Sequence, residues 1–243
     1  MIVSSLSNQQ LEFYAREGYV FLGSVMDEPT LENFRAEEAR FRDAKTDAPG
    51  QLTIFRSQVH DFSPVVREYA LNGPHLGAMQ QLVAPNLALW FNQFVTKLPD
   101  GESQKSEFPW HQDNGYVSIE PANNVTIWIA LDDVDEENGC VWVVPRSHEN
   151  GLLDHTPKGA DSWFLNVPVE GDGVPAILKA GEAVAFTGLT LHRSKWNKTG
   201  RARRAFFLEY ADASATFGKD KTSILRAPES WIVRGAAPIS SFS

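Results

Sequence analysis

The sequence predicts a mainly β fold, either a sandwich or a barrel, preceded by a helix-rich part. Short apolar segments recur between residues 87 and 210, and turn residues separate them. The first third of the chain instead carries amphipathic segments with helix start and stop residues. A hydrophobic content of 42% and a charged content of 22% are those of an ordinary globular chain, here of 243 residues.

Two helices are expected at the start of the chain. Ser7 and Gln10 form the pattern of a capping box, and Gly18 ends the helix that follows. A second helix begins near Asp27, has a proline in its first turn, and ends before the polar stretch 43–50. A short strand at 19–22 and weaker helices at 64–71 and 75–82 complete this part.

The expected strands follow residue 86, and long polar connections separate some of them. Connections at 100–108 and 149–172 are of the kind that forms lids and binding walls on a rigid β scaffold. We expect a single domain over 1–243, with a helix-rich part (1–86), a β core (87–212) and a C-terminal extension (213–243). The strands are expected at 87–96, 125–131, 140–144, 183–186, 189–194 and 203–210.

The charge balance argues against some classes of partner. The chain has 31 acidic and 22 basic residues, a net charge of −9, whereas proteins that bind nucleic acid usually carry an excess of Lys and Arg. No apolar run approaches the roughly 18 residues of a membrane span, and the first ten residues lack the features of a secretory signal. We therefore expect a cytoplasmic protein that binds neither nucleic acid nor membrane. The single cysteine, Cys140, leaves only His and carboxylate groups to hold a metal.

One stretch carries candidate metal ligands. In Trp110-His111-Gln112-Asp113, the two-residue period of a strand lets His111 and Asp113 aim their side chains the same way. His192, at the end of a β-like run, supplies a third donor, and two histidines with one carboxylate form the facial triad of non-haem Fe(II) oxygenases. Alone, the H-x-D pattern is weak evidence, because a single strand histidine is more often a core or surface residue.

A basic residue is expected next to these candidate ligands. The residues after His192 read as a turn centred between Asn197 and Lys198, which would set His192 directly opposite Arg203 in a hairpin. A guanidinium there suits the far carboxylate of a keto acid, because the two groups form a two-pronged, charge-assisted hydrogen bond. The alternative is that Arg203 belongs, with its neighbouring arginines, to a solvated basic edge.

Further motifs accompany these residues, in a fixed order along the chain. They are Thr96-Lys97-Leu98-Pro99, Trp128 within 127–132, Asn138-Gly139-Cys140, Pro145-Arg146-Ser147-His148, Gly181-Glu182, and the segment from His192 to Arg203. With them, residues 87–210 resemble the phytanoyl-CoA dioxygenase family of Fe(II)/2-oxoglutarate-dependent oxygenases, which includes ectoine hydroxylase. The resemblance implies a double-stranded β-helix core of the jelly-roll, cupin-like type, buttressed by the N-terminal helices.

The resemblance also implies roles for particular positions. His111, Asp113 and His192 would bind Fe(II), with O2 as the oxidant, while Arg203 and Ser194 would hold the far carboxylate of 2-oxoglutarate. We expect Lys97 and Trp128 in the same cosubstrate pocket, and Gln93, Asn114 and Tyr116 as substrate contacts. Two positions depart from the family pattern. Arg146 is expected on the surface, and Trp196 either packs in a turn or walls the entrance.

The function expected from this resemblance is hydroxylation of an unactivated C–H bond in a small metabolite, with release of succinate and CO2. An amino acid, a zwitterion or a natural-product intermediate is expected as substrate. Related halogenases lack the carboxylate ligand, so Asp113 argues for hydroxylation. The alternative is a metal-binding cupin that is not an oxygenase, which would need no keto acid. The oligomeric state is not readable from the sequence.

Overall fold

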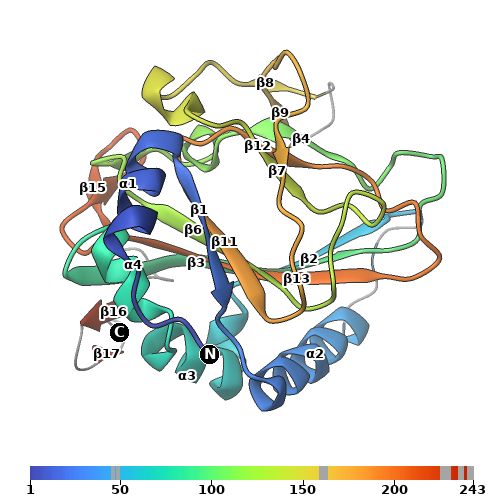
Figure 1. The fold of residues 1–243 in the computed structure, drawn as a ribbon, viewed down its shortest axis with the longest axis horizontal. Coiled ribbons are helices and arrows are strands. Elements are labelled where there is room, and N and C mark those ends of the chain that lie inside the picture. The colour runs from blue at the N-terminus through green and yellow to red at the C-terminus, as the bar shows by residue number, and fades with distance from the viewer. Residues whose placement is uncertain (45–46, 48–49, 159–163, 225–230, 235–237, 240–243) are drawn as a thin grey trace.

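Two antiparallel sheets and a layer of helices form the structure, which is a computed structural model (Figure 1). It describes residues 1–243 apart from 45–46, 48–49, 159–163, 225–230, 235–237 and 240–243. Figure 1 shows α2, α3 and α4 on one side of the larger sheet and the smaller sheet on the other. The mainly β, jelly-roll class expected from the sequence is confirmed, with the helices against the outer face of the larger sheet.

The larger sheet has the strand order β1-β11-β6-β13-β3-β16-β17, and β2 also pairs with β3. The smaller sheet has the order β10-β7-β12-β4. The strands of the larger sheet are β1 (Tyr19–Ser24), β2 (Thr53–Ser57), β3 (Asn86–Lys97), β6 (Val125–Ala130), β11 (Glu182–Thr187), β13 (Arg203–Asp212), β16 (Trp231–Arg234) and β17 (Pro238–Ile239). Those of the smaller sheet are β4 (Phe108–His111), β7 (Val141–Val143), β10 (Val174–Pro175) and β12 (His192–Ser194).

The remaining elements are short strands outside these sheets, and the helices. Local signals read from the sequence start and end the first two helices. Ser7 and Gln10 form the expected capping box of α1, Gly18 ends it at φ 81°, and the Asp27 side chain caps α2. The helices are α1 (Asn8–Glu17), α2 (Glu28–Asp43), α3 (Pro64–Asn72), α4 (Leu76–Leu82) and the 3-10 turns η1 (Val59–Asp61), η2 (Asp113–Gly115) and η3 (Ser147–Asn150). The short strands are β5 (Ile119–Glu120), β8 (Thr156–Pro157), β9 (Leu165–Asn166), β14 (Thr216–Phe217) and β15 (Thr222–Ser223).

The two faces of the larger sheet serve different cores. On β13, Phe206 and Leu208 pack with Phe34 of α2 and with other helix residues, while Ala205 packs in a second core between the sheets. Because side chains alternate along a strand, the face that carries Ala205 also carries Phe207 toward the smaller sheet. The space between the two sheets is therefore where strand residues converge to form a site.

The predicted hairpin between His192 and Arg203 is wrong. His192 pairs with His111 and Val143 in the smaller sheet, whereas Arg203 pairs with Lys97 in the larger sheet. The connection between the two strands crosses from one sheet to the other, and its Asn197 amide donates hydrogen bonds to the carbonyls of Lys97 and Arg201. Spacing alone could not distinguish such a crossing from a tight hairpin, because turn residues suit both.

The strands missing from the sequence prediction include β2 and β4, one in each sheet. The strand β2 falls in a stretch left unassigned, and β4 begins at the end of the predicted connection 100–108. Both are short, and their pairing partners, β3 and β12, are distant along the chain. Among the described residues, no helix is long and apolar enough to span a bilayer.

A buried histidine links the helical layer to β13. His75 Nε2 lies 2.9 Å from the Tyr210 hydroxyl, which donates to the Ala70 carbonyl. Burial lowers the pKa of His75 to about 3. As the pH falls, His75 is protonated in the unfolded chain at a higher pH than in the folded chain. The free energy of unfolding therefore decreases as the pH drops from about 6.5 toward 3.

This linkage predicts a measurable acid lability. At 1.36 kcal/mol per pH unit, the lowered pKa of His75 reduces the free energy of unfolding by roughly 2 kcal/mol between pH 6.5 and pH 5. We expect the fall in Tm between pH 7 and pH 5 to be smaller by about 4–8 °C in His75→Gln than in the wild type. Thermal melts followed by circular dichroism measure this difference. The same pH dependence in both proteins would contradict the assignment.

Candidate metal centre and pocket

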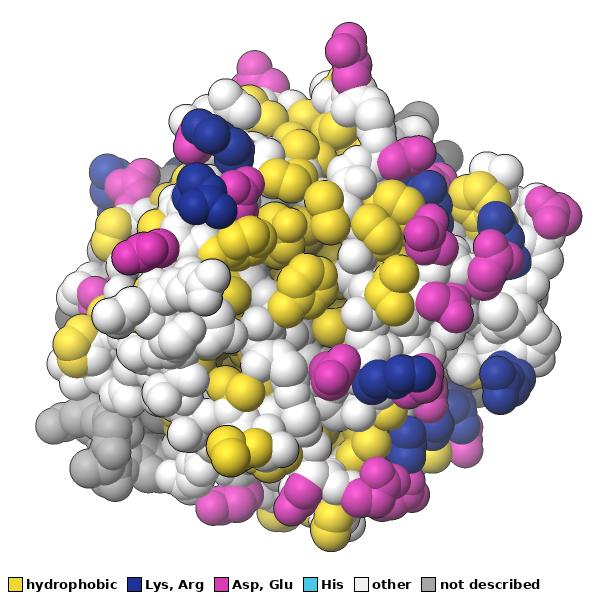
Figure 2. All heavy atoms as spheres, in the orientation of Figure 1, with side chains coloured by type: hydrophobic (Ala, Val, Ile, Leu, Met, Phe, Trp, Pro, Cys, Tyr) yellow, Lys and Arg dark blue, Asp and Glu magenta, His cyan; other side chains and the backbone are white. Residues whose placement is uncertain are grey.

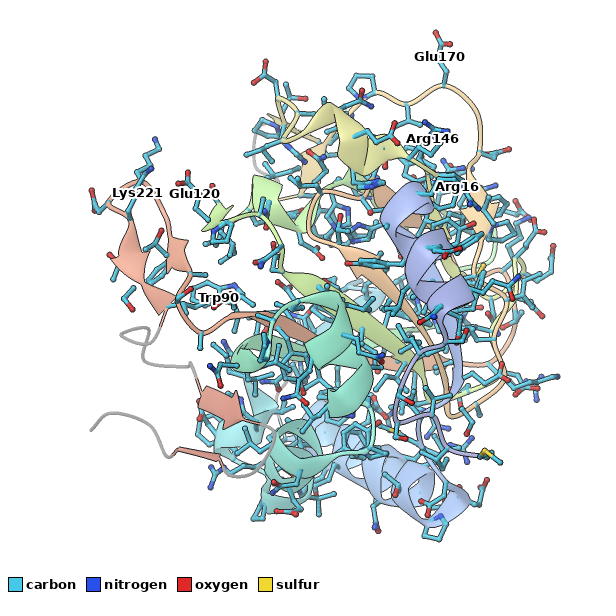
Figure 3. All side chains as sticks on the ribbon, turned by 60° about the vertical axis from the view of Figure 1, so that its left-hand side comes forward. Arg16, Trp90, Glu120, Arg146, Glu170 and Lys221 are labelled. Atoms are coloured by element: carbon cyan, nitrogen blue, oxygen red, sulfur yellow. The ribbon has the colours of Figure 1, made fainter. Side chains whose placement is uncertain are left out.

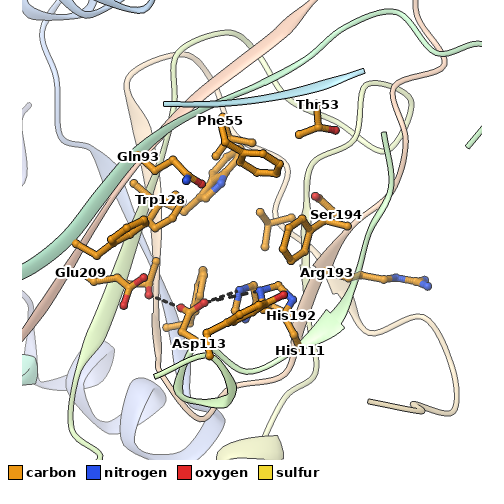
Figure 4. A pocket seen from close by; sticks show the side chains of 18 of the residues that line it. Thr53, Phe55, Gln93, His111, Asp113, Trp128, His192, Arg193, Ser194 and Glu209 are labelled. Carbon is orange, nitrogen blue, oxygen red and sulfur yellow. Dashed lines mark hydrogen bonds and ion pairs between the residues drawn. The ribbon is translucent and has the colours of Figure 1, made fainter. Parts of the chain in front are cut away.

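Three side chains from three elements meet between the sheets (Figure 4). His111 ends β4, His192 begins β12, and the two are cross-strand partners. Asp113 lies just beyond β4, at the start of η2. Its Oδ1 is 3.7 Å from His111 Nε2 and 3.4 Å from His192 Nε2. The three ligand atoms lie within 4.8 Å of one another, so one ion can touch all three.

The hydrogen bonds around these side chains aim them at a common point. Nδ1 of His111 lies 2.8 Å from the Pro109 carbonyl, and Nδ1 of His192 lies 3.0 Å from the Thr190 carbonyl. Each ring then donates from Nδ1 and leaves the Nε2 lone pair free for a metal. Burial and the charge on His192 lower the pKa of His111 to about 3, which favours the neutral imidazole that binds metals.

The carboxylate is oriented in the same way. Thr126 Oγ1 donates a 2.5 Å hydrogen bond to Asp113 Oδ2, which leaves Oδ1 facing the histidines. Burial would raise the pKa of Asp113, but the two histidines and Thr126 outweigh it and hold the pKa at about 2. The donor set of two imidazoles and one ionised carboxylate on one face fits Fe(II) and leaves positions open.

The pocket beside this triad has a volume of about 390 Å³ and largely aromatic walls. It opens between the sheets, with strands of the larger sheet on one side and β4, β7 and β12 on the other. Trp90 of β3 also packs 4.8 Å from the ring of Phe217, so β14 supports this wall (Figure 3). The aromatic lining comprises Phe55, Trp90, Phe91, Phe108, Tyr116, Trp128, Phe186 and Phe207.

One end of the site holds a buried guanidinium. The side chain of Arg203 is 1% exposed and its charged carbon lies 5.3 Å from the centre of the Trp128 ring. Among the described residues, none hydrogen bonds to any of its three guanidinium nitrogens. Burial lowers its pKa to about 10, so it keeps its charge at neutral pH. An unpaired buried cation is costly, and a bound carboxylate would compensate it.

Lys97, the cross-strand partner of Arg203, lines the pocket together with Ser194, whereas Arg203 is not one of the lining residues. The Lys97 ammonium donates to the carbonyls of Ser194 and Lys195, at 2.9 and 2.6 Å, and so joins β3 to the end of β12. Burial and the charge of Arg203 hold the pKa of Lys97 well below its usual value. The sequence-predicted cosubstrate residues Arg203, Ser194, Lys97 and Trp128 thus lie together.

The predicted substrate contacts separate into two groups. Gln93 and Tyr116 line the pocket, where the Gln93 amide donates to Ser57 Oγ and the Tyr116 hydroxyl accepts from the Leu165 amide. Burial raises the pKa of Tyr116 to about 12. Asn114 is buried and does not line the pocket, and its backbone amide donates to the Gly188 carbonyl.

The pocket residues that sequence reasoning missed include Thr126, Phe207 and Glu209. All three line the pocket. Two-residue alternation from Arg203 along β13 leads to Phe207 and then Glu209, so this pattern could have identified them. Thr126 has no comparable signal, because its role depends on β6 lying beside η2.

The other positions singled out in the sequence lie outside the pocket. Arg146 is exposed and pairs with Glu149 at 3.2 Å, which confirms its expected surface position (Figure 3). Trp196 lies in the connection between β12 and β13, with the Lys198 ammonium 5.4 Å from its ring, so it does not wall the entrance. Cys140 is buried in the core between the sheets.

Comparison with known proteins agrees with this geometry. The model of the phytanoyl-CoA dioxygenase (PhyH) family matches residues 14–205. The chain is 26% identical to a probable phytanoyl-CoA dioxygenase of Caenorhabditis elegans, over 86% of this chain and 76% of the relative. It is 25% identical to a phytanoyl-CoA dioxygenase of Arabidopsis thaliana, over 97% of this chain and 80% of that relative.

Solved structures share the fold. SnoK, a non-heme α-ketoglutarate-dependent carbocyclase from nogalamycin biosynthesis, is 25% identical with a TM-score of 0.73, over 89% of this chain and 88% of SnoK. EvdO2 from Micromonospora carbonacea, solved with 2-oxoglutarate, is 20% identical with a TM-score of 0.71, over 92% of this chain and 97% of EvdO2.

The hydrogen bond from Thr126 generates a prediction about metal affinity. We expect Thr126→Val to weaken Fe(II) binding by about 10–100-fold, because Asp113 loses the partner that orients it. Anaerobic Fe(II) titration measures the change, and Co(II) serves as a spectroscopic substitute. Thr216→Val, on β14 and away from the triad, is the control and should bind like the wild type. Equal affinities for all three proteins would show that the hydrogen bond does not tune the site.

Proposed function

The chain belongs to the phytanoyl-CoA dioxygenase family, and from this premise we propose that it hydroxylates an unactivated C–H bond of a small, largely apolar metabolite. Its class is that of the non-haem Fe(II)/2-oxoglutarate-dependent dioxygenases, which release succinate and CO2. The observation that carries the proposal is the buried, unpaired guanidinium of Arg203 next to Trp128 and Lys97, which line the same pocket as the His111, Asp113 and His192 triad.

The protein's own residues divide the work of binding and positioning. His111, Asp113 and His192 would hold Fe(II) by one face, and the bound metal would supply cosubstrate chelation and O2 activation. Arg203 would pair with the far carboxylate of 2-oxoglutarate, which fixes that molecule lengthwise toward the triad. The aromatic walls would exclude water and hold a substrate carbon near the open side of the triad.

The pocket favours a small substrate over a polyanionic one. Of its lining residues, Lys97 donates to two carbonyls and Arg193 pairs with Asp172, so neither is free for a phosphate. Figure 4 shows the Arg193 side chain pointing away from the pocket. Figure 2 shows that, on the face drawn there, basic side chains stand beside acidic ones. This supports the expectation of a small-molecule substrate, and the cytoplasmic location stays a prediction.

The competing function is a metal-binding cupin without oxygenase activity. It would use the same triad, but it gives no reason for Arg203 to be buried without a partner beside it. Stoichiometric binding of 2-oxoglutarate therefore separates the two functions.

The role of Arg203 predicts the outcome of an anaerobic titration with Fe(II) and 2-oxoglutarate. The wild type should develop the weak visible charge-transfer band of a keto acid chelated to iron, and His192→Ala should lose it. In Arg203→Ala, we expect the dissociation constant for 2-oxoglutarate to rise by about 30-fold or more, since truncating one partner of a buried charge pair costs about 2 kcal/mol or more.

The adjacent arginine is the matched control. Arg204 points to the opposite face of β13 and pairs with Asp132 at 2.5 Å, so Arg204→Ala should bind the keto acid like the wild type. If metal-loaded wild type gives no band, the cosubstrate assignment fails and the non-oxygenase cupin is favoured.

A further inference from the structure

A second carboxyl group faces the pocket and takes no part in the triad. Glu209 of β13 is 8% exposed and pairs across the strands with Thr126 on one side and Phe91 on the other. Figure 4 shows its carboxyl group on the Asp113 side of the pocket, away from Ser194. It therefore lies beside the triad and at the opposite end from the proposed cosubstrate site.

Glu209 has no compensating partner within the described part of the chain. No residue there donates a hydrogen bond to its carboxyl group, and no Lys or Arg forms an ion pair with it. Its charged neighbour is Asp113, which has the same sign, and burial together with that charge raises the pKa of Glu209 well above its usual value. Acidic side chains are almost never buried unless they are paired, so this one is set to meet a group that the protein does not supply.

The surroundings of Glu209 are aromatic. The ring of Phe91, its strand neighbour, lies 5.8 Å from that of Phe207, and both line the pocket with Trp90 and Trp128. Aromatic faces attract a cation within about 6 Å, and the attraction is greatest where water is excluded. A carboxyl group set among aromatic rings is the arrangement that recognises a protonated amine.

The strand β13 is also polarised along its inward face. Arg203 stands at one end and Glu209 six residues later, about 20 Å away at 3.4 Å per residue. The cationic end suits the dianionic cosubstrate, and the acidic end repels a second anion. Because the metal would hold the Asp113 carboxylate, Glu209 is the carboxyl group that a substrate would meet there, and its carboxylate would pair with an amine and repel an acid.

From these observations we infer that Glu209 and the neighbouring aromatic walls form a subsite for a protonated amine, so that the substrate is an apolar molecule that carries a basic nitrogen. This inference rests on the proposed function, because it names the substrate class of the same pocket. Glu209 is then a specificity-determining residue, which anchors the amine while an apolar part of the molecule lies over the triad.

Matched pairs of small compounds test the subsite. We would use 2-phenylethylamine, 2-phenylethanol and phenylacetate, with the three corresponding cyclohexyl compounds, on anaerobic protein loaded with Fe(II) and 2-oxoglutarate. Quenching of tryptophan fluorescence and ligand-observed NMR measure each dissociation constant at pH 7, where a primary alkylamine is protonated. We expect the wild type to bind each amine at least about 10-fold more tightly than its alcohol, and to bind the carboxylates most weakly.

Variants of Glu209 distinguish recognition of the amine by its charge from recognition by its shape. Glu209→Gln keeps the size of the side chain and should bring the amine and alcohol to about equal affinity, whereas Glu209→Asp should keep part of the preference. Glu12→Gln, an exposed change of the same chemistry on α1, should bind like the wild type. The keto acid band should persist in all of these variants, which shows that each is folded and loaded.

Two results would overturn the inference. One is a wild type that binds no amine more tightly than its alcohol, including the case in which none of the compounds binds. The other is an amine preference that survives in Glu209→Gln. Failure of the proposed function looks different, because the wild type would then give no keto acid band, whatever its affinity for amines.

Discussion

The pairing of β4 with β12 is the constraint on which the site depends. It sets His111 directly opposite His192, and the 3-10 turn after β4 brings Asp113 to both rings. Backbone carbonyls hold the two Nδ1 atoms, and Thr126 holds the carboxylate. In each of the three side chains, one atom makes the hydrogen bond that orients the group, and a different atom is left free to bind the metal. Such preorganisation favours a metal that needs three fixed ligands and open positions.

The larger sheet provides the pocket because its two faces have different tasks. One face of β13 carries Phe206, Leu208 and Tyr210 into the helical core. The other carries Phe207 and Glu209 into the pocket, with Arg203 on the same face. The helices stabilise the sheet from behind and leave its inner face free to bind small molecules. The sheet therefore forms a rigid wall of the pocket, and every second residue of β13 contributes a side chain to it.

The charges inside the pocket are arranged along one axis. Lys97 contacts Ser194 and pairs with Arg203 at one end, and Figure 4 shows the carboxyl groups of Asp113 and Glu209 away from Ser194. Burial makes each of these groups costly unless a partner compensates it. The Lys97 ammonium donates hydrogen bonds to two carbonyls, and the Asp113 carboxylate faces the two histidines and accepts a hydrogen bond from Thr126. Arg203 and Glu209 lack protein partners among the described residues, and these two unpartnered groups support the proposed cosubstrate and the inferred amine.

The sequence by itself determined the local features of this protein. Ser7, Gln10 and Gly18 bound the first helix through contacts within one or two turns, and alternation placed Gln93 and Lys97 on one pocket-facing side of β3. The spacing of metal-ligating residue types also identified the three donors that the structure brings together, as well as a β fold that carries them.

Only the tertiary structure decided which strands pair. It moved Arg203 from the predicted hairpin with His192 into the other sheet, and it buried Asn114 outside the pocket. It also brought Glu209 beside Asp113 by way of Thr126. The physical reason is that caps and alternation act over a few residues, whereas strand pairing joins segments far apart in the chain. Its free energy depends on which faces are buried together, and no local pattern records that choice.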